Sequence, residues 1–124
     1  MKRSSFILVF DPTRDNYLMG KRSSKNRRGF WDFFGGTIEE NESPRKGGLR
    51  EFREETGVKI DKEELNKLTV IKLPEKEVHV YFILRRKEDV TIQLGPEHSR
   101  CGWFKKRKLP KKITPTTRKI SIIM

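Results

Sequence analysis

Three glutamates in the middle of the chain are the side chains best able to do chemistry. Glu51, Glu54 and Glu55 stand at positions i, i+3 and i+4, which would place their carboxylates on one face of a helix. Like charges at this spacing repel one another, so the cluster needs a counter-charge. Arg50 and Arg53 are one source, in which case the cluster is a solvated helix face. A bound cation is the other source, and oxygen ligands favour Mg²⁺, Mn²⁺ or Ca²⁺.

The helix that must carry these glutamates has recognisable start and stop signals. Ser43 followed by Pro44 is typical of an N-cap and a first helical residue, and Gly57 is typical of the residue that ends a helix. Leu49 and Phe52 fall on a different face from the glutamates and can anchor the helix to a core. We therefore predict a helix between Pro44 and Gly57 whose glutamates face outward together.

Short apolar segments on both sides of this helix predict strands. Thr114 and Pro115 repeat the N-cap and first-residue signature, which predicts a second helix over residues 116–124. Strands around a central helix, followed by a closing helix, indicate an α/β fold built in layers. The expected strands cover residues 6–10, 17–19, 31–33, 68–73, 78–84, 90–94 and 103–104.

The length and composition bound the class of protein. A chain of 124 residues fits one compact domain, which we expect over residues 1–124. Cys101 is the only cysteine, so an internal disulfide framework is excluded, and a reducing, cytoplasmic location is expected. No apolar run approaches the ~20 residues that cross a bilayer. The five apolar residues over 6–10 are too few for a signal peptide, so we expect neither secretion nor a membrane partner.

The net charge of +12 is concentrated at the two ends of the chain. Residues 1–34 carry a net charge of +5 and residues 105–124 carry +8, whereas residues 35–104 are nearly balanced at −1. An excess of this size is typical of proteins that bind polyanions, such as nucleic acids or nucleotide phosphates. The alternative is that the basic residues only keep a small domain in solution.

The glutamates belong to a longer pattern that resembles the Nudix box, G-x5-E-x7-R-E-U-x-E-E-x-G-U, in which U is a bulky apolar residue. All seven fixed letters match over the segment that reads Gly36-x5-Glu42-x7-Arg50-Glu51-Phe52-Arg53-Glu54-Glu55-Thr56-Gly57-Val58. The preceding segment from Trp31 to Gly36 is similar to the family's W-x-x-P-G-G lead-in, with Phe34 in place of the proline. Glu97, six residues before Trp103, resembles the late glutamate of small MutT-type members.

This resemblance implies a Nudix hydrolase with an α/β/α sandwich around a central mixed sheet. Such an enzyme cleaves a diphosphate linked to another moiety, X, and uses Mg²⁺ or Mn²⁺. The implied catalytic residues are Glu51, Glu54, Glu97 and Arg50, with Arg50 orienting the glutamates and the identity of the general base open. The implied metal ligands are the backbone carbonyl of Gly35 and the side chains of Glu51, Glu54, Glu55 and Glu97. Gly36, Glu42 and Gly57 are implied to be structural, with Glu42 anchoring the loop that enters the helix.

Three residues before the box are candidates for binding substrate. Lys21 and Arg22 end a predicted strand at a place where small family members often put a basic residue near the substrate phosphates. Trp31 either stacks on a base or packs in the core. His79 and His98 have no partner at ligand spacing, and we interpret both as residues that bind no metal.

Three functions are compatible with these features, and they differ in substrate. The favoured one is hydrolysis of a small nucleotide, such as a (d)NTP, to a nucleoside monophosphate and pyrophosphate. The second is removal of pyrophosphate or a cap from the 5′ end of RNA, for which the basic flanks, including Lys105–Lys108 and Lys111–Lys112, are the argument. The third is a non-catalytic Nudix-fold domain that binds nucleic acid, although such a domain needs none of the glutamates. The oligomeric state stays open.

Overall fold

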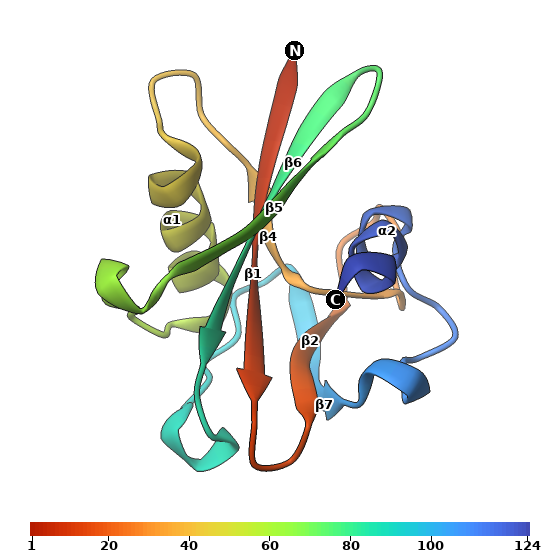
Figure 1. The fold of residues 1–124 in the computed structure, drawn as a ribbon. Coiled ribbons are helices and arrows are strands. Elements are labelled where there is room, and N and C mark those ends of the chain that lie inside the picture. Colours follow the sequence, from red (N-terminus) through yellow and green to blue (C-terminus); the bar gives the residue numbers. More distant parts are fainter.

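The computed structural model describes residues 1–124 and consists of one mixed sheet with a helix on each side (Figure 1). Three short 3-10 helices lie in the connections, and no helix has the length and apolar character to span a membrane. The strands and α-helices, in chain order, are β1 (Lys2–Asp11), β2 (Asn16–Arg22), β3 (Trp31–Asp32), β4 (Phe34–Thr37), α1 (Pro44–Thr56), β5 (Asn66–Lys72), β6 (Lys76–Leu84), β7 (His98–Phe104) and α2 (Pro115–Ile123).

The sheet is organised around β1. Its order is β3-β2-β1-β6-β5, with β4 also paired to β1 and β7 also paired to β2. β1 and β6 run parallel in a continuous register from Lys2↔Lys76 to Phe10↔Leu84, and every other pair is antiparallel. The predicted mixed sheet is therefore confirmed.

Each face of the sheet carries its own hydrophobic core. Because side chains alternate along a strand, Ile7 and Val9 of β1 join one core while Leu8 joins the other. Phe52 of α1 is buried in the first core, and Ile120 of α2 is buried in the second. Figure 1 shows the two helices on opposite sides of the sheet. This arrangement is the α/β/α sandwich that the sequence predicts.

Helix α1 begins and ends where its capping residues predict. The Ser43 Oγ accepts a hydrogen bond from the Lys46 N–H at 3.2 Å, and Pro44 is the first helical residue. Gly57 has a φ of +71°, and its N–H donates to the Arg53 carbonyl at 2.8 Å. The left-handed conformation favours glycine there, so both ends of the glutamate-bearing helix are fixed by local sequence.

The predicted strand over residues 90–94 is wrong. Val90, Ile92 and Leu94 do pack against the core on the α1 side, which explains the alternating pattern. The backbone, however, bonds to the end of α1 and not to a strand, since the Gln93 N–H donates to the Thr56 carbonyl at 2.8 Å. This segment therefore carries the chain across the end of the helix toward Glu97.

Candidate active site

The structure gathers the four predicted glutamates around one small pocket. Glu51, Glu54 and Glu55 contribute from α1, and Glu97 contributes from the loop before β7. The pocket has a volume of about 160 Å³ and no hydrophobic lining residue. Residues separated by more than 40 positions in the chain thus present carboxylates to a single site.

Glu55 lies at the bottom of this carboxylate pocket and is only 5% exposed. Its Oε1 accepts a hydrogen bond from the Gly35 N–H at 2.8 Å. Burial, followed by the repulsion from Asp32, raises the pKa of Glu55 to about 10. The expectation that all three glutamates face outward is therefore wrong for Glu55, because strand β4 covers it at Gly35.

Glu51 lies beside the same strand, close to the backbone of Gly36. A Cβ on Gly36 would lie 2.7 Å from the Glu51 carboxylate, so a larger residue there would displace that carboxylate from its present position. Burial also raises the pKa of Glu51, while the neighbouring Arg50 opposes that rise. The two glycines of β4 thus make different contacts: Gly35 donates its N–H to Glu55, and Gly36 leaves space for Glu51.

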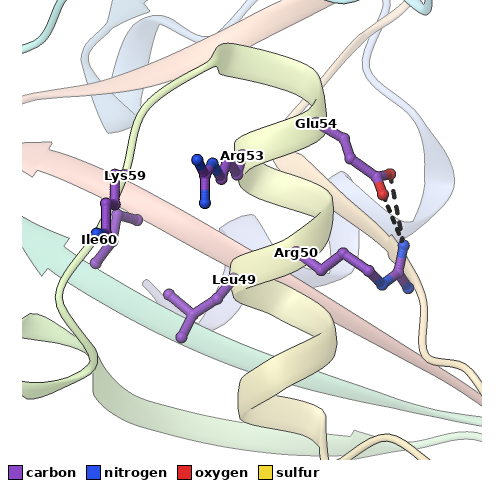
Figure 2. Close-up of a pocket in the computed structure, with 6 residues that line it drawn as sticks. All are labelled: Leu49, Arg50, Arg53, Glu54, Lys59 and Ile60. Carbon is purple, nitrogen blue, oxygen red and sulfur yellow. Dashed lines mark hydrogen bonds and ion pairs between the residues drawn. The ribbon is translucent and has the colours of Figure 1, made fainter.

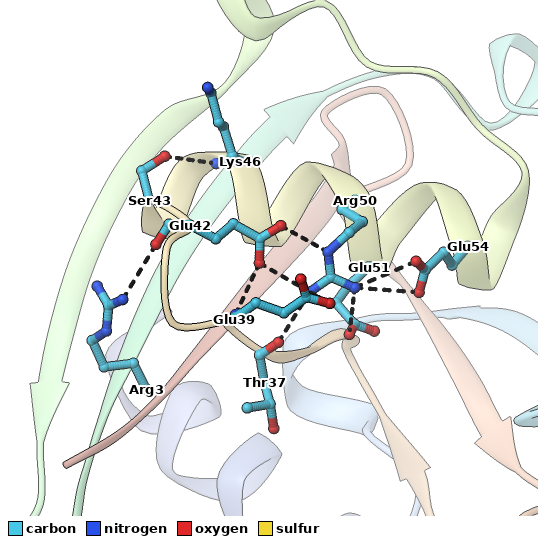
Figure 3. A network of polar contacts seen from close by, with 9 residues as sticks. All are labelled: Arg3, Thr37, Glu39, Glu42, Ser43, Lys46, Arg50, Glu51 and Glu54. Atoms are coloured by element: carbon cyan, nitrogen blue, oxygen red, sulfur yellow. Dashed lines mark hydrogen bonds and ion pairs between the residues drawn. The ribbon is translucent and has the colours of Figure 1, made fainter.

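Arg50 connects the glutamates to the loop that enters the helix (Figure 3). Its Nε and Nη2 donate to the two carboxylate oxygens of Glu42 at 2.7 and 3.0 Å. Its Nη1 donates to Glu51 at 3.2 Å and to Glu54 at 3.3 Å. The paired hydrogen bonds from Arg50 lower the pKa of Glu42 to about 2 and raise the pKa of Arg50 itself. Arg50 thus joins Glu42 to two of the glutamates, and the orienting role of Arg50 and the anchoring role of Glu42 stay predictions.

The loop that carries Glu97 is fixed on two sides. The Gly95 N–H donates to the Glu55 carbonyl at 3.0 Å, which fastens the loop to the end of α1. Ser23, just after β2, donates its N–H to the Glu97 carbonyl and its hydroxyl to the Pro96 carbonyl, both at 2.9 Å. The end of α1 and Ser23 therefore fix the backbone of this loop, and the exposed Glu97 side chain lines the pocket.

The side chains that line the carboxylate pocket are of the chemical type that binds a hard divalent cation. All the candidate side-chain donors are carboxylate oxygens, and no Arg or Lys side chain pairs with the buried Glu55 carboxylate, although the His98 Nδ1 lies 3.9 Å from its Oε2. No three His, Cys, Asp or Glu side chains converge closely enough to hold an ion in the present arrangement. Glu54 is the most exposed of the three helix glutamates, at 60%, and its carboxylate is paired with Arg50. The ligand roles of these glutamates and of the Gly35 carbonyl stay predictions.

A second pocket of about 390 Å³ lies on the other side of Gly35 and Gly36 of β4. It is almost entirely polar, and its basic side chains are Arg22, Arg27 and Lys76. One wall is the start of α2, residues 114–116. Three cationic groups beside a carboxylate cluster form a setting suited to a phosphate-bearing ligand.

Of the three predicted substrate residues, only Arg22 lines this basic pocket. Trp31 packs edge-on against Phe104, with ring centroids 4.9 Å apart, at the margin of the core on the α2 side. Lys21 is its neighbour across the sheet. Contact of Lys21 or Trp31 with substrate stays a prediction.

A third cleft, of about 610 Å³, lies on the outer side of α1 (Figure 2). Leu49 and Ile60 supply apolar surface, and Arg53 and Lys59 supply charge. Glu54 lines both this cleft and the carboxylate pocket, so the two are adjacent.

Sequence reasoning missed His98, which is buried between the basic pocket and the carboxylate pocket. Its side chain is 1% exposed, and its Nε2 lies 2.9 Å from the Oδ1 of Asp32. The other carboxylate oxygen of Asp32 accepts from Arg22 Nη1 at 3.0 Å. The partners of His98 lie far from it in the chain, so no local spacing could have revealed them.

Comparison with known proteins agrees with this geometry. Residues 1–122 match the family model of the NUDIX domain, and the chain belongs to that family. The chain is similar to an 8-oxo-dGTP diphosphatase from Proteus vulgaris, with 32% identity over 71 residues, which are 56% of this chain and 63% of that protein. It is also similar to an octanoyltransferase from Myxococcus xanthus, with 30% identity over 87 residues, which are 66% of this chain and 24% of that protein.

Among solved structures, the chain is similar to a MutT NUDIX hydrolase from Burkholderia pseudomallei. The TM-score is 0.83 at 20% identity, and the match covers 99% of this chain and 97% of that one. At this identity the likeness establishes the fold, in agreement with the MutT-type resemblance of the sequence. The chain spans less than two thirds of the length of each of these two curated relatives.

Proposed function

We propose that residues 1–124 act as one cytoplasmic domain that hydrolyses nucleotides as a divalent-metal-dependent pyrophosphohydrolase. The reaction converts a nucleoside triphosphate to a nucleoside monophosphate and pyrophosphate. One observation carries the proposal: four carboxylates around one pocket lie next to a basic pocket, with Gly35 and Gly36 of β4 between them. A polyphosphate and a carboxylate cluster repel each other, so this pairing of sites serves a substrate that arrives with a cation.

Each residue has a task in this proposal. Glu51, Glu54, Glu55 and Glu97, with the Gly35 carbonyl, would hold Mg²⁺ or Mn²⁺. The bound cation supplies positive charge against the phosphates and makes water easier to deprotonate. Glu97, the exposed loop carboxylate, accepts the proton of the water whose oxygen attacks phosphorus. Arg22, Arg27 and Lys76 bind phosphate oxygens and so stabilise the charge that develops on them.

The size of the basic pocket favours a single nucleotide. A volume of about 390 Å³ lies within the range of roughly 300–1,000 Å³ that small-ligand pockets occupy. The name of the Proteus vulgaris relative, 8-oxo-dGTP diphosphatase, is consistent with a deoxynucleoside triphosphate. We therefore put (d)NTPs first among the possible substrates.

A second candidate, the 5′ end of RNA, is favoured by the position of the C-terminal basic residues. The Trp31 N–H donates to the Lys112 carbonyl at 2.7 Å, and the Thr114 N–H donates to the Trp31 carbonyl at 3.1 Å. Lys111 and Lys112 are exposed and directly precede the residues that form one wall of the basic pocket. If the 5′ end of an RNA entered this pocket, the phosphates that follow it in the RNA chain would lie near these lysines.

The decisive experiment is a hydrolysis panel with Mg²⁺ and with Mn²⁺, containing (d)NTPs, 8-oxo-dGTP, ADP-ribose, a dinucleoside polyphosphate and 5′-triphosphorylated RNA. Glu54→Gln removes one charge from the carboxylate pocket, and Glu40→Gln removes one from an exposed carboxyl outside it. We expect turnover that Glu54→Gln lowers at least about 100-fold, as loss of a catalytic carboxylate does, and that Glu40→Gln preserves. Absence of turnover on every phosphoanhydride, or equal turnover by Glu54→Gln, refutes the enzyme.

The same panel separates the two substrates. If RNA is the substrate, its KM should rise steeply with salt because lysine–phosphate contacts are screened. A preference for free nucleotides that salt leaves unchanged refutes the RNA candidate.

A further inference from the structure

A buried chain of polar contacts joins the basic pocket to the carboxylate pocket. It starts at Arg22, whose Nη1 donates to the Oδ2 of Asp32 at 3.0 Å. Asp32 is 6% exposed, and its Oδ1 lies 2.9 Å from the Nε2 of His98. The Nδ1 on the other side of the imidazole lies 3.9 Å from the Oε2 of Glu55. Arg22 of the basic pocket therefore lies at one end of this series of contacts, and Glu55 of the carboxylate pocket lies at the other.

The packing around His98 leaves its ring little freedom. The Phe34 ring meets the imidazole edge-on, with centroids 4.9 Å apart. On another side lies Gly20, where a Cβ would come within 2.7 Å of the His98 Cδ2. The imidazole ring is therefore packed between Gly20 of β2 and Phe34 of β4, and these contacts restrict its orientation.

The Nδ1 atom of His98 has no hydrogen-bond partner although it is fully buried. Buried polar atoms without a partner are rare, and each calls for an explanation. An apolar side chain would fill the same space without leaving a polar atom unpaired. The Oε2 of the Glu55 carboxylate lies 3.9 Å from Nδ1, and the Gly35 N–H of β4 holds the other oxygen of that carboxylate.

We propose that His98 is a positioning residue that keeps the Glu55 carboxylate and the Arg22 guanidinium at a fixed separation. Its Nε2 side orients Asp32 and, through it, Arg22. Its Nδ1 side limits the position of Glu55 when that carboxylate turns its Oε2 toward a cation. The proposal rests on the function proposed above, since it assigns a metal to Glu55 and a phosphate to Arg22.

Two substitutions of His98 test the roles of its Nε2 and its Nδ1 separately. The amide nitrogen of Gln can take the place of Nε2, so His98→Gln keeps the contact with Asp32 and loses the group that faces Glu55. The amide of Asn takes the place of Nδ1, so His98→Asn keeps the group that faces Glu55 and loses the contact with Asp32. A residue that merely fills space would not distinguish these variants.

Mn²⁺ affinity, measured by electron paramagnetic resonance without substrate, is the first readout. Partners of metal ligands typically contribute 10–100-fold to metal affinity, so we expect His98→Gln to weaken Mn²⁺ binding about 10-fold with its KM nearly unchanged. We expect His98→Asn to raise KM about 10-fold, because Arg22 is no longer held, with a smaller effect on Mn²⁺. Unchanged Mn²⁺ affinity and KM in both folded variants, with only a lower melting temperature, overturn the proposal.

A third variant tests the coupling even if neither His98 variant folds. By Coulomb's law, removal of a cationic side chain near the pocket should strengthen Mn²⁺ binding, and Arg27→Gln is the control for this effect. Arg22→Gln should instead weaken Mn²⁺ binding, by about 3-fold, because it also releases Asp32 and His98. Equal strengthening by both variants overturns the proposal. Failure of the wild type to hydrolyse any phosphoanhydride refutes the proposed function alone, since the Mn²⁺ measurements still decide the role of His98.

Discussion

The ion pair between Arg50 and Glu42 should make a measurable contribution to the stability of the entry to helix α1. Glu42→Gln replaces one carboxylate oxygen by an amide nitrogen that cannot accept from Arg50. The pKa of Glu42 falls from its ordinary 4.5 to about 2, chiefly through its hydrogen bonds with Arg50. At 1.36 kcal/mol per pH unit this shift corresponds to a ceiling of about 3 kcal/mol. Because the side chains of Glu42 and Arg50 are 15% and 27% exposed, we expect a loss of about 1–2 kcal/mol.

The pH dependence of this loss distinguishes the ion pair from a general disturbance. A carboxylate whose pKa is lowered by folding stabilises the protein fully above its unfolded pKa, and this stabilisation disappears as the pH falls through the folded value. Urea unfolding at several pH values should therefore show a difference between wild type and Glu42→Gln that is constant from pH 7 to 5 and shrinks between pH 4.5 and about 2. Glu40→Gln, at an exposed carboxyl nearby, is the matched control. A difference below about 0.3 kcal/mol, or one that persists at pH 2, would refute the reasoning.

Three further predictions concern the proposed base, the core and the helix end. Glu97→Gln should lower kcat about 10²–10⁴-fold with little change in KM, and steady-state kinetics with an unchanged kcat would exclude Glu97 as the base. Phe52→Ala should lower the free energy of unfolding by about 3–5 kcal/mol because this ring is fully buried against Phe34, whereas Phe52→Leu should cost less in the same urea titration. Gly57→Ala should cost about 1–2 kcal/mol because of the φ of +71°, and Gly57→Asn should cost less; a neutral Gly57→Ala would show that the helix end can rearrange.

Local signals in the sequence predicted the parts of the fold that local forces determine. The ends of α1 followed from Ser43, Pro44 and Gly57, because capping depends on residues within one turn of the helix end. The strand predicted over residues 90–94 failed for the complementary reason. Its alternating apolar residues do face a core, but the backbone partner is the end of α1, which no pattern within the segment can reveal.

In the candidate site, too, local sequence predicted some features, whereas others depend on contacts between distant residues. The i, i+3, i+4 spacing placed the glutamates together but could not show that Glu55 is covered, since the cover is Gly35 of β4, a different element. Arg22 was found because it ends a strand at a place typical of the family. His98 was passed over because its role depends on Asp32 and Glu55, 66 and 43 positions away in the chain. Single residues acquire such roles only through tertiary contacts.

The parallel pairing of β1 with β6 has a consequence for how the molecule folds. Each paired position in this ladder joins residues 74 apart, as in Lys2↔Lys76, and helix α1 lies within the intervening chain. Such contacts require closure of a long loop before they return any stabilisation, which slows folding. During synthesis, β1 must therefore wait for β6 to emerge, and the helix with its glutamates has no complete sheet to dock on until then. We expect that the three helix glutamates reach their final positions late on the folding pathway, so that in a nascent chain ending before β6 the helix is not yet docked on the sheet. Hydrogen exchange on stalled nascent chains of increasing length would show at which chain length the amides of α1 become protected. Protection of α1 before residue 76 has emerged would show that the helix docks earlier.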